Sequence, residues 1–261
     1  MKLRAPHVAL AALSLSIGAC QSAQTVPPAA AAPAATSAEG VIAAMHDRYA
    51  DSWYRTLRFR QRVVHTPPDG SSRPNEVWLE HAEVPGKLRI DLGENFTGAG
   101  NIYSGDSVFI FQPGRAVVRR ASRNPLLVLG FDVYRQPVDE SLRILQAQRF
   151  DLTKFRTDTW QGRPHYVIGA TDPADLRSPQ FWIEQDRLLF TRLITPAGAS
   201  SVSEIRFDNY ERLGGAWIAP LVVFMRDGKE VMREEYFDME ANVKIPEGLF
   251  NPDMWDKIKP K

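Results

Sequence analysis

Alternating apolar and polar residues run through most of this 261-residue chain and restrict it to a β-rich fold. In 57–63 (LRFRQRV) the odd positions are mostly apolar and the even positions carry three arginines, and 87–92 (KLRIDL) and 205–210 (IRFDNY) alternate in the same way. Successive side chains of a strand point to opposite faces, so each stretch predicts a strand with one buried and one wet face. Turn sequences such as PPDG at 67–70 and PG at 85–86 separate the stretches, which predicts antiparallel pairing of neighbours.

Two parts of the body depart from this period. Residues 38–53 carry apolar side chains three and four apart, which predicts an N-terminal helix with Ser37 as a candidate N-cap. Residues 124–131 (NPLLVLGF) and 141–148 predict a helical insert, because Pro125 suits the first turn of a helix. About five strands precede the insert and about seven follow it. We therefore expect an α+β fold, a strongly curved antiparallel sheet with helices on one side.

Residues 1–20 (MKLRAPHVALAALSLSIGAC) have the pattern of a bacterial lipoprotein signal. Lys2 and Arg4 precede an apolar stretch that is too short to span a bilayer core of ~30 Å. Small residues then lead to Cys20, the only cysteine, which we expect to be acylated and to anchor the protein to a membrane. The alternative is an ordinary secretory signal that ends on a chance cysteine. By resemblance to enterobacterial lipoproteins, Gln21 favours the periplasmic face of the outer membrane of a Gram-negative bacterium.

The sequence predicts one folded domain behind this anchor. The predicted segments are a signal at 1–19, an acylated cysteine with an Ala/Pro-rich tether at 20–37, a single domain at 38–255, and a tail at 256–261. The chain has 32 basic and 31 acidic side chains. This balance argues against a nucleic-acid partner, which needs a basic footprint.

Several stretches of the body form a pattern that extends over most of residues 40–252. They are PGKLRID at 85–91, GD at 105–106, FWI at 181–183 with Leu189 and Arg192, IRFDNY at 205–210, GAWIAP at 215–220, and Asn242 through 245–246 (IP) to 249–250 (LF). In these stretches the body resembles the LolA-like family of periplasmic lipoprotein-sorting and lipid-binding proteins. The resemblance implies a half-open β-barrel of about 11 strands closed by a helical lid, with a cavity that takes acyl chains. The insert at 125–148 falls where such a lid would lie. A lipid anchor of its own is a trait of the LolB-type receptor rather than of the soluble LolA carrier.

The insert supplies the first candidate binding residues. Leu126, Leu127, Leu129 and Phe131 form either a buried core helix or a lid that covers a cavity and moves aside for a ligand. The aromatic candidates for the inward face are Trp78, Phe109, Phe111, Trp182 and Phe207. In the strand at 76–83 we also expect Val77 and Leu79 to face inward. Alternation defines a face, but it does not distinguish a dry core from the wall of a ligand cavity.

Arginines supply a second set of candidates. Arg58, Arg60 and Arg62 lie on one strand face, and Arg119 belongs to a basic cluster just before the insert. Each set is either a solvated face or a contact to the lid or to a lipid headgroup, since a guanidinium can bind phosphate through two hydrogen bonds.

The sequence contains little that indicates a catalytic site. The five histidines are dispersed, and the sequence has no Gly-x-Ser-x-Gly elbow and no Gly-rich loop followed by Lys-Ser/Thr. We therefore expect no enzyme, no cofactor and no metal. The preferred hypothesis is a monomeric outer-membrane lipoprotein that binds the acyl chains of a lipid or a lipoprotein. The alternative is a non-catalytic module with a filled core that docks on another envelope protein.

Overall fold

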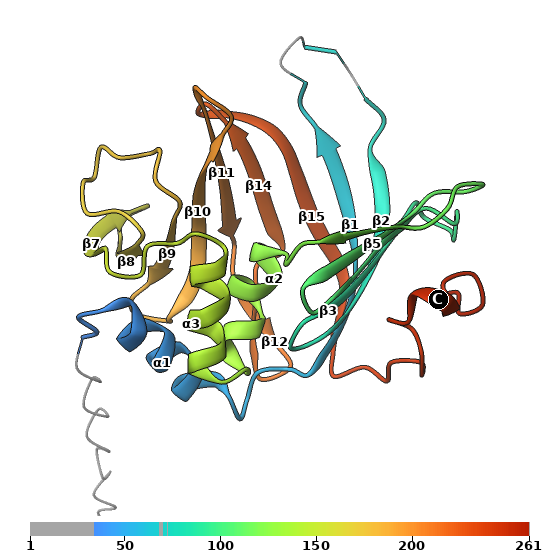
Figure 1. The fold of residues 1–261 in the computed structure, drawn as a ribbon, viewed down its shortest axis with the longest axis horizontal. Coiled ribbons are helices and arrows are strands. Elements are labelled where there is room, and N and C mark those ends of the chain that lie inside the picture. Colours follow the sequence, from blue (N-terminus) through green and yellow to red (C-terminus); the bar gives the residue numbers. More distant parts are fainter. Residues whose placement is uncertain (1–33, 68–69, 72, 261) are drawn as a thin grey trace, which may run out of the picture. The chain divides into compact units, whose positions relative to one another are not determined.

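A curved antiparallel sheet of thirteen strands forms the framework of residues 34–67, 70–71 and 73–260, the part of the chain that the computed structural model describes (Figure 1). The spatial order is β6-β5-β4-β3-β2-β1-β15-β14-β11-β10-β9-β8-β7. β12 (Glu211–Leu213) and β13 (Ala216–Ile218) form a separate small ribbon. The thirteen strands are β1 (Thr56–His65), β2 (Glu76–Glu83), β3 (Lys87–Leu92), β4 (Gly100–Ser104), β5 (Ser107–Phe111), β6 (Val118–Ala121), β7 (Phe155–Trp160), β8 (Arg163–Ile168), β9 (Gln180–Glu184), β10 (Leu189–Ala197), β11 (Ser201–Asp208), β14 (Leu221–Arg226) and β15 (Lys229–Ala241).

Helices cover the concave face of this sheet (Figure 1). They are α1 (Ala38–Tyr49), α2 (Pro125–Gly130), the 3₁₀ helix η1 (Asp132–Tyr134) and α3 (Val138–Ala147). The predicted cap is confirmed, because Ser37 Oγ accepts a hydrogen bond from the Gly40 N–H at 3.1 Å. Residues 35–261 form one compact unit, whereas the predicted signal, Cys20 and most of the tether lie outside the described residues.

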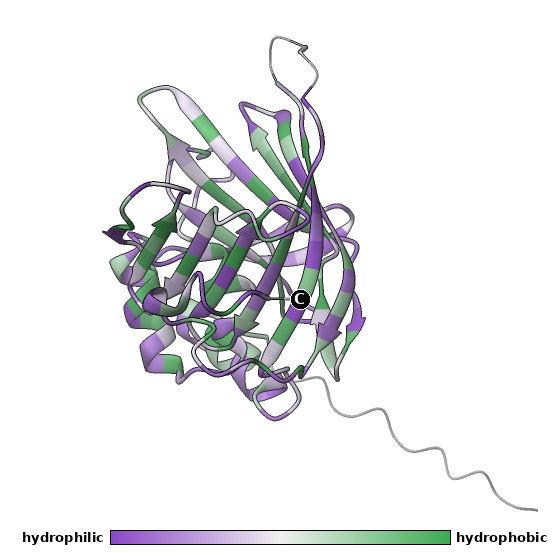
Figure 2. Cartoon of the chain, turned by 90° about the vertical axis from the view of Figure 1, so that its right-hand side faces the viewer, coloured by the Kyte–Doolittle hydropathy of each residue, from purple (hydrophilic) through white to green (hydrophobic). Residues whose placement is uncertain are grey.

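The main core lies between the helices and the concave face. The apolar side of α1, with Val41, Ile42 and Met45, is fully buried there. Trp53 stacks on Tyr134 of η1 with ring centroids 3.8 Å apart, which joins the end of the α1 region to the helical insert. Along the strands, hydrophobic and hydrophilic residues alternate as a two-faced sheet requires (Figure 2).

The C-terminal segment, which includes the 3₁₀ helix η2 (Pro252–Met254), packs on the opposite, convex face of β3 to β5. The Trp255 ring stacks on Phe111 at 4.1 Å, and Ile102 and Leu249 are buried in the same cluster. Both faces of the sheet are therefore covered in this region.

The predicted fold class is confirmed, with local corrections. The main sheet has thirteen strands rather than about eleven, and helix α1 ends at Tyr49 rather than near Trp53. The inward assignment of Val77 and Leu79 is wrong. Residues paired across neighbouring strands share a face, and Leu79 pairs with Arg60, whereas Glu80 pairs with Phe59. Trp78, Glu80 and Ala82 are the residues of β2 that face the helices.

Candidate functional site

Helix α2 owes its position to a local capping arrangement. Asn124 Oδ1 accepts hydrogen bonds from the Leu126 and Leu127 N–H groups at 2.9 and 3.4 Å, and Pro125 occupies the first turn. Leu127 and Leu129 are buried, while Leu126 is half-buried. This short apolar helix thus lies over the concave face with its leucines directed into the fold.

The middle of the insert, around η1, is fixed by polar contacts. Asp132 Oδ1 accepts a hydrogen bond from the Gly86 N–H in the β2–β3 turn at 2.9 Å, and Arg123 Nη2 donates to Asp132 Oδ2 at 3.1 Å. Arg135 Nη1 donates to the carbonyl oxygens of Ala50 and Trp53, both at 2.8 Å. The η1 segment is therefore held to the sheet on one side and to the α1 region on the other.

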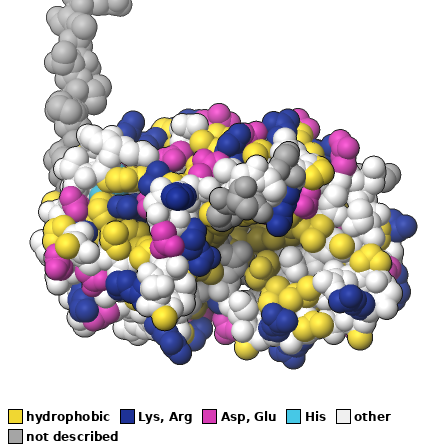
Figure 3. Space-filling view, turned by 90° about the horizontal axis from the view of Figure 1, so that it is seen from above, with side chains coloured by type: hydrophobic (Ala, Val, Ile, Leu, Met, Phe, Trp, Pro, Cys, Tyr) yellow, Lys and Arg dark blue, Asp and Glu magenta, His cyan; other side chains and the backbone are white. Residues whose placement is uncertain are grey.

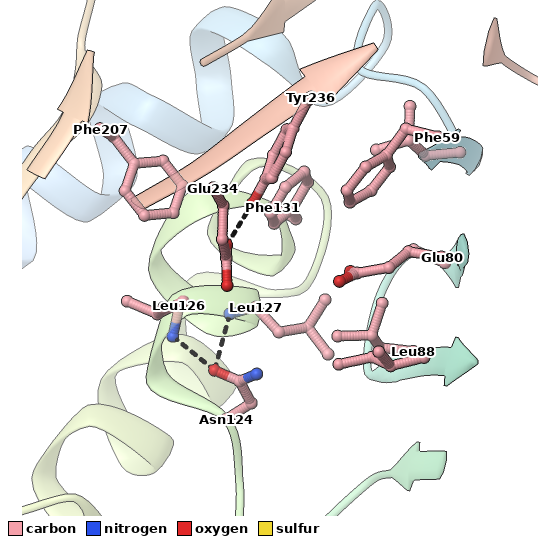
Figure 4. Close-up of a pocket in the computed structure, with 13 residues that line it drawn as sticks. Phe59, Glu80, Leu88, Asn124, Leu126, Leu127, Phe131, Phe207, Glu234 and Tyr236 are labelled. Carbon is pink, nitrogen blue, oxygen red and sulfur yellow. Dashed lines mark hydrogen bonds between the residues drawn. The ribbon is translucent and has the colours of Figure 1, made fainter. Parts of the chain in front are cut away.

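A cavity of about 80 Å³ lies between α2 and the sheet. Apolar side chains from β1, β2, β3, β11 and the insert supply most of its wall, and four polar side chains complete it (Figure 4). Its lining residues are Leu57, Phe59, Glu80, Ala82, Leu88, Ile90, Asn124, Leu126, Leu127, Phe131, Phe207, Glu234 and Tyr236. An apolar pocket with a few convergent polar groups is the usual form of a site for a small hydrophobic ligand.

Two glutamates, Glu80 and Glu234, line this otherwise mostly apolar cavity. Glu80 is 6% exposed, and its carboxylate makes no hydrogen bond or ion pair with any described residue. Burial raises its pKa well above the ordinary value, and the neighbouring charge of Glu234 raises it further. Burial also raises the pKa of Glu234 to about 7, against the smaller effects of Tyr236 and Gln61, which lower it. The Tyr236 hydroxyl donates a hydrogen bond to Glu234 Oε2 at 3.2 Å.

The structure brings four of the nine predicted cavity and lid residues together. Leu126, Leu127, Phe131 and Phe207 line the cavity. Leu129 is buried in the core beside it, and Trp78 lies on the same face of β2, where its Nε1 donates to Glu76. The other three lie on the convex face, because each falls in the opposite phase of its strand. They are Phe109 and Phe111 of β5 and Trp182 of β9.

The predicted arginines also lie away from the cavity. Arg58 is ion-paired with Glu240, and Arg62 Nη1 lies 2.9 Å from Glu235 Oε2. Arg60 shares their face of β1, and Arg119 donates to Ser107 Oγ from β6. A polar residue next to an inward apolar residue in a strand must face outward, which accounts for the row on β1.

Sequence reasoning missed the two cavity glutamates. Each stands in the apolar phase of its strand, since Glu80 lies between Trp78 and Ala82, and Glu234 precedes Tyr236 by two positions. A charged residue at an inward position was the available signal.

In the part of the chain that the structure describes, no three His, Cys, Asp or Glu side chains are grouped to hold a metal ion. Among the same residues, each helix is too short or too polar to traverse a lipid bilayer.

Comparisons with known proteins identify the fold. No protein-family model matches the chain, and no curated protein matches it. Among solved structures, a LolA superfamily protein from Nitrosomonas europaea is similar, with a TM-score of 0.54 and 13% identity over 84% of this chain and 99% of that one. A putative outer membrane lipoprotein-sorting protein domain from Vibrio parahaemolyticus has a TM-score of 0.56 and 14% identity over 84% and 97%. A DUF1329 family protein from Desulfovibrio piger has a TM-score of 0.55 and 12% identity over 84% and 97%. The half-open sheet with its helical insert is thus the fold of the LolA-like proteins.

Proposed function

We propose that this protein binds acyl chains of a lipid or a lipoprotein between the sheet and α2, and that a lipid on Cys20 holds it on the periplasmic face of the outer membrane. The supporting observation is the apolar cavity under α2, whose wall combines concave-face strands with Leu126, Leu127 and Phe131. Binding of this kind is non-catalytic. Membrane attachment through Cys20 and an acyl ligand in the cavity are both part of the proposal.

The similar structures support the type of ligand. One of them is described as a putative outer membrane lipoprotein-sorting domain and another as a LolA superfamily protein. A shared fold does not by itself assign a function. The proposal therefore rests on the cavity, and the fold supports it.

The cavity must enlarge to take a chain. Its volume of about 80 Å³ is well below the ~300–1,000 Å³ of ordinary ligand pockets. Helix α2 is the wall element suited to move, because η1 after it is held by Asp132 and Arg135 while α2 itself packs through leucines. Seen from above, the surface has a hollow lined by hydrophobic side chains with Lys and Arg around it, which is consistent with an entry for an amphiphile (Figure 3).

Native mass spectrometry with lipid extraction, on protein purified from its own envelope without detergent, tests this proposal. We expect an added mass that carries an acyl chain. Leu126→Glu places a charge in the cavity wall and is expected to abolish that mass, because burying an unpaired carboxylate with the chain is unfavourable. Val118→Glu makes the same change at an exposed valine of β6 and should leave binding intact.

Two results would contradict the proposal. One is a protein mass without ligand that persists after incubation with phospholipid. The other is equal binding by Leu126→Glu and Val118→Glu. A ligand-free protein that co-purifies with a stoichiometric envelope protein would instead support the interaction module with a filled core.

A further inference from the structure

The buried acidic side chains of the described residues divide into two kinds. Most of them have an arginine partner in the fold. The pairs are Asp91 with Arg89, Asp132 with Arg123, Glu184 with Arg163 and Arg187, and Glu204 with Arg192 and Arg206. Glu80 is as buried as these but has no cationic partner among the described residues. The sheet therefore compensates its other buried acids and leaves this one uncompensated.

Glu80 and Glu234 face each other across the cavity under α2. Their carboxylates point into the cavity from opposite sides of β1 (Figure 4). Glu80 pairs with Phe59 of β1 and Glu234 with Val63, so both lie on the concave face. The lining of the cavity contains no lysine and no arginine.

A second polar group lies beside the pair. Gln61 is 1% exposed and sits on the concave face of β1, between Phe59 and Val63. Neither its Nε2 nor its Oε1 makes a well-formed hydrogen bond with a described residue. Gln61 lies near enough to Glu234 to lower the pKa of that carboxyl, and an incompletely hydrogen-bonded buried amide beside the unpaired Glu80 leaves room for a further polar partner.

A purely apolar ligand gives these groups nothing to bind. An alcohol or a hydrocarbon against Glu80 would supply no counter-charge, so the carboxyl would have to keep its proton, in line with its raised pKa. A protonated amine has three donors, enough for two carboxylates and the amide oxygen of Gln61. Its positive charge would also replace the repulsion between the two carboxylates by attraction to both.

We propose that the polar end of the cavity binds the protonated primary amine of an amphiphile, with Glu80 and Glu234 as its counter-ions and Gln61 as a further acceptor. The acyl chain of the same molecule would lie along the apolar wall formed by Leu88, Ile90 and Leu126. This inference rests on the proposed acyl-binding function and narrows its ligand to amine-bearing amphiphiles.

Calorimetric titration of the purified protein at about pH 8 with dodecylamine and with 1-dodecanol, at monomeric concentrations, tests the inference. The two probes share a chain and differ in charge. We expect dodecylamine to bind about ten- to hundredfold more tightly, because hydrogen bonds to charged groups contribute about 1.5–3 kcal/mol. Glu80→Gln should remove most of that preference, which is read as the ratio of the two affinities within each protein. Glu235→Gln, on the same strand as Glu234 but ion-paired with Arg62 on the convex face, should keep the preference.

The outcomes separate this inference from the proposed function. Equal affinities for the two probes, or an amine preference that survives in the Glu80→Gln/Glu234→Gln double variant, would overturn the amine site while leaving the acyl cavity standing. Failure of both probes to bind would overturn the acyl cavity itself. Circular dichroism of each variant confirms that a loss of binding is not a loss of fold.

Discussion

Asp132 of η1 and Gly86 of the β2–β3 turn are joined by a buried hydrogen bond, from the Gly86 N–H to Asp132 Oδ1 at 2.9 Å. Gly86 has a φ of +87°, a conformation that glycine adopts readily, and this conformation directs its N–H at the insert. Arg123 occupies the second carboxylate oxygen. One side chain thus connects η1, the element after α2, to the sheet that α2 covers.

Asp132→Ala should lower the free energy of unfolding by about 3–5 kcal/mol, because it leaves the Arg123 charge and the Gly86 N–H without their buried partner. Urea unfolding measures this loss. Asp106→Ala is the matched control, since Asp106 is exposed and lies 3.7 Å from the same arginine, and a surface pair contributes about 0–1 kcal/mol. Similar losses in both variants would contradict the assigned role of Asp132.

The Arg89–Asp91 pair predicts strong coupling between two residues of β3. Arg89 is fully buried, donates two hydrogen bonds of 2.9 Å to Asp91, and lies 4.0 Å from the Trp255 ring centre. Arg89→Leu should cost about 3–5 kcal/mol because it leaves a buried carboxylate unpaired. The double variant Arg89→Leu/Asp91→Leu should cost clearly less than the sum of the single changes. Additive losses in urea unfolding would show that the pair is not coupled.

The pKa of Glu234, raised to about 7, predicts a specific pH dependence. A carboxyl that holds its proton more tightly in the folded state contributes stability below its unfolded pKa of ~4.3, and this contribution is lost as pH rises through 7. The stability of the wild type relative to Glu234→Gln should therefore fall by about 1–3 kcal/mol between pH 4.5 and pH 8. The difference between the two proteins is the quantity to compare. Burial lowers the pKa of His81 to about 4, so the titration of His81 raises the stability as pH rises. This effect is present in the wild type and in Glu234→Gln, and it cancels in the difference. A difference that is constant with pH would refute the prediction.

Gly100 predicts a steric effect where β3, β4 and the C-terminal segment meet. A Cβ atom there would lie 2.1 Å from the Ile90 carbonyl oxygen and 2.7 Å from the Trp255 ring. Gly100→Ala should therefore destabilise by more than about 2 kcal/mol and expose Trp255, which fluorescence and urea unfolding detect together. Gly114→Ala is the control, because its Cβ would meet open space at a φ of +71° and cost about 1 kcal/mol.

The sequence was sufficient to predict the fold class and most element positions. Period-two alternation has a direct physical cause, so strands β2 and β3 were predicted with the bounds that the structure has. The order of strands was less accessible, because pairing of β1 with β15 depends on residues far apart in the chain.

The site was predicted only in part. Leu126 and Leu127 could be identified because an apolar run after a capping Asn and Pro stands out in a β-rich chain. The face of Trp182 or Phe111 could not be identified, because both are buried on the convex face. Phe111 packs under the C-terminal segment, and Trp182 packs beside Arg156 and Arg192. Glu80 was missed because Val77 and Leu79 were assigned to the inward phase of β2, and the pairing of Glu80 with Phe59 shows that the other phase faces the cavity.

The place of β15 in the sheet has a consequence for how the chain acquires its structure. Strands β1 to β6 are joined by consecutive pairings, and so, in order, are β7, β8, β9, β10, β11 and β14, but these two halves meet only through β15. Ala241 of β15 pairs with Leu57 of β1, so the first strand obtains its second neighbour only when the last strand is in place. The halves can form by local hairpins, whereas closure requires contacts of high sequence separation and is therefore slow. A chain that has not yet placed β15 would hold two separate half-sheets, and the cavity between sheet and α2, which Glu234 and Tyr236 of β15 help to line, would form only with that final strand.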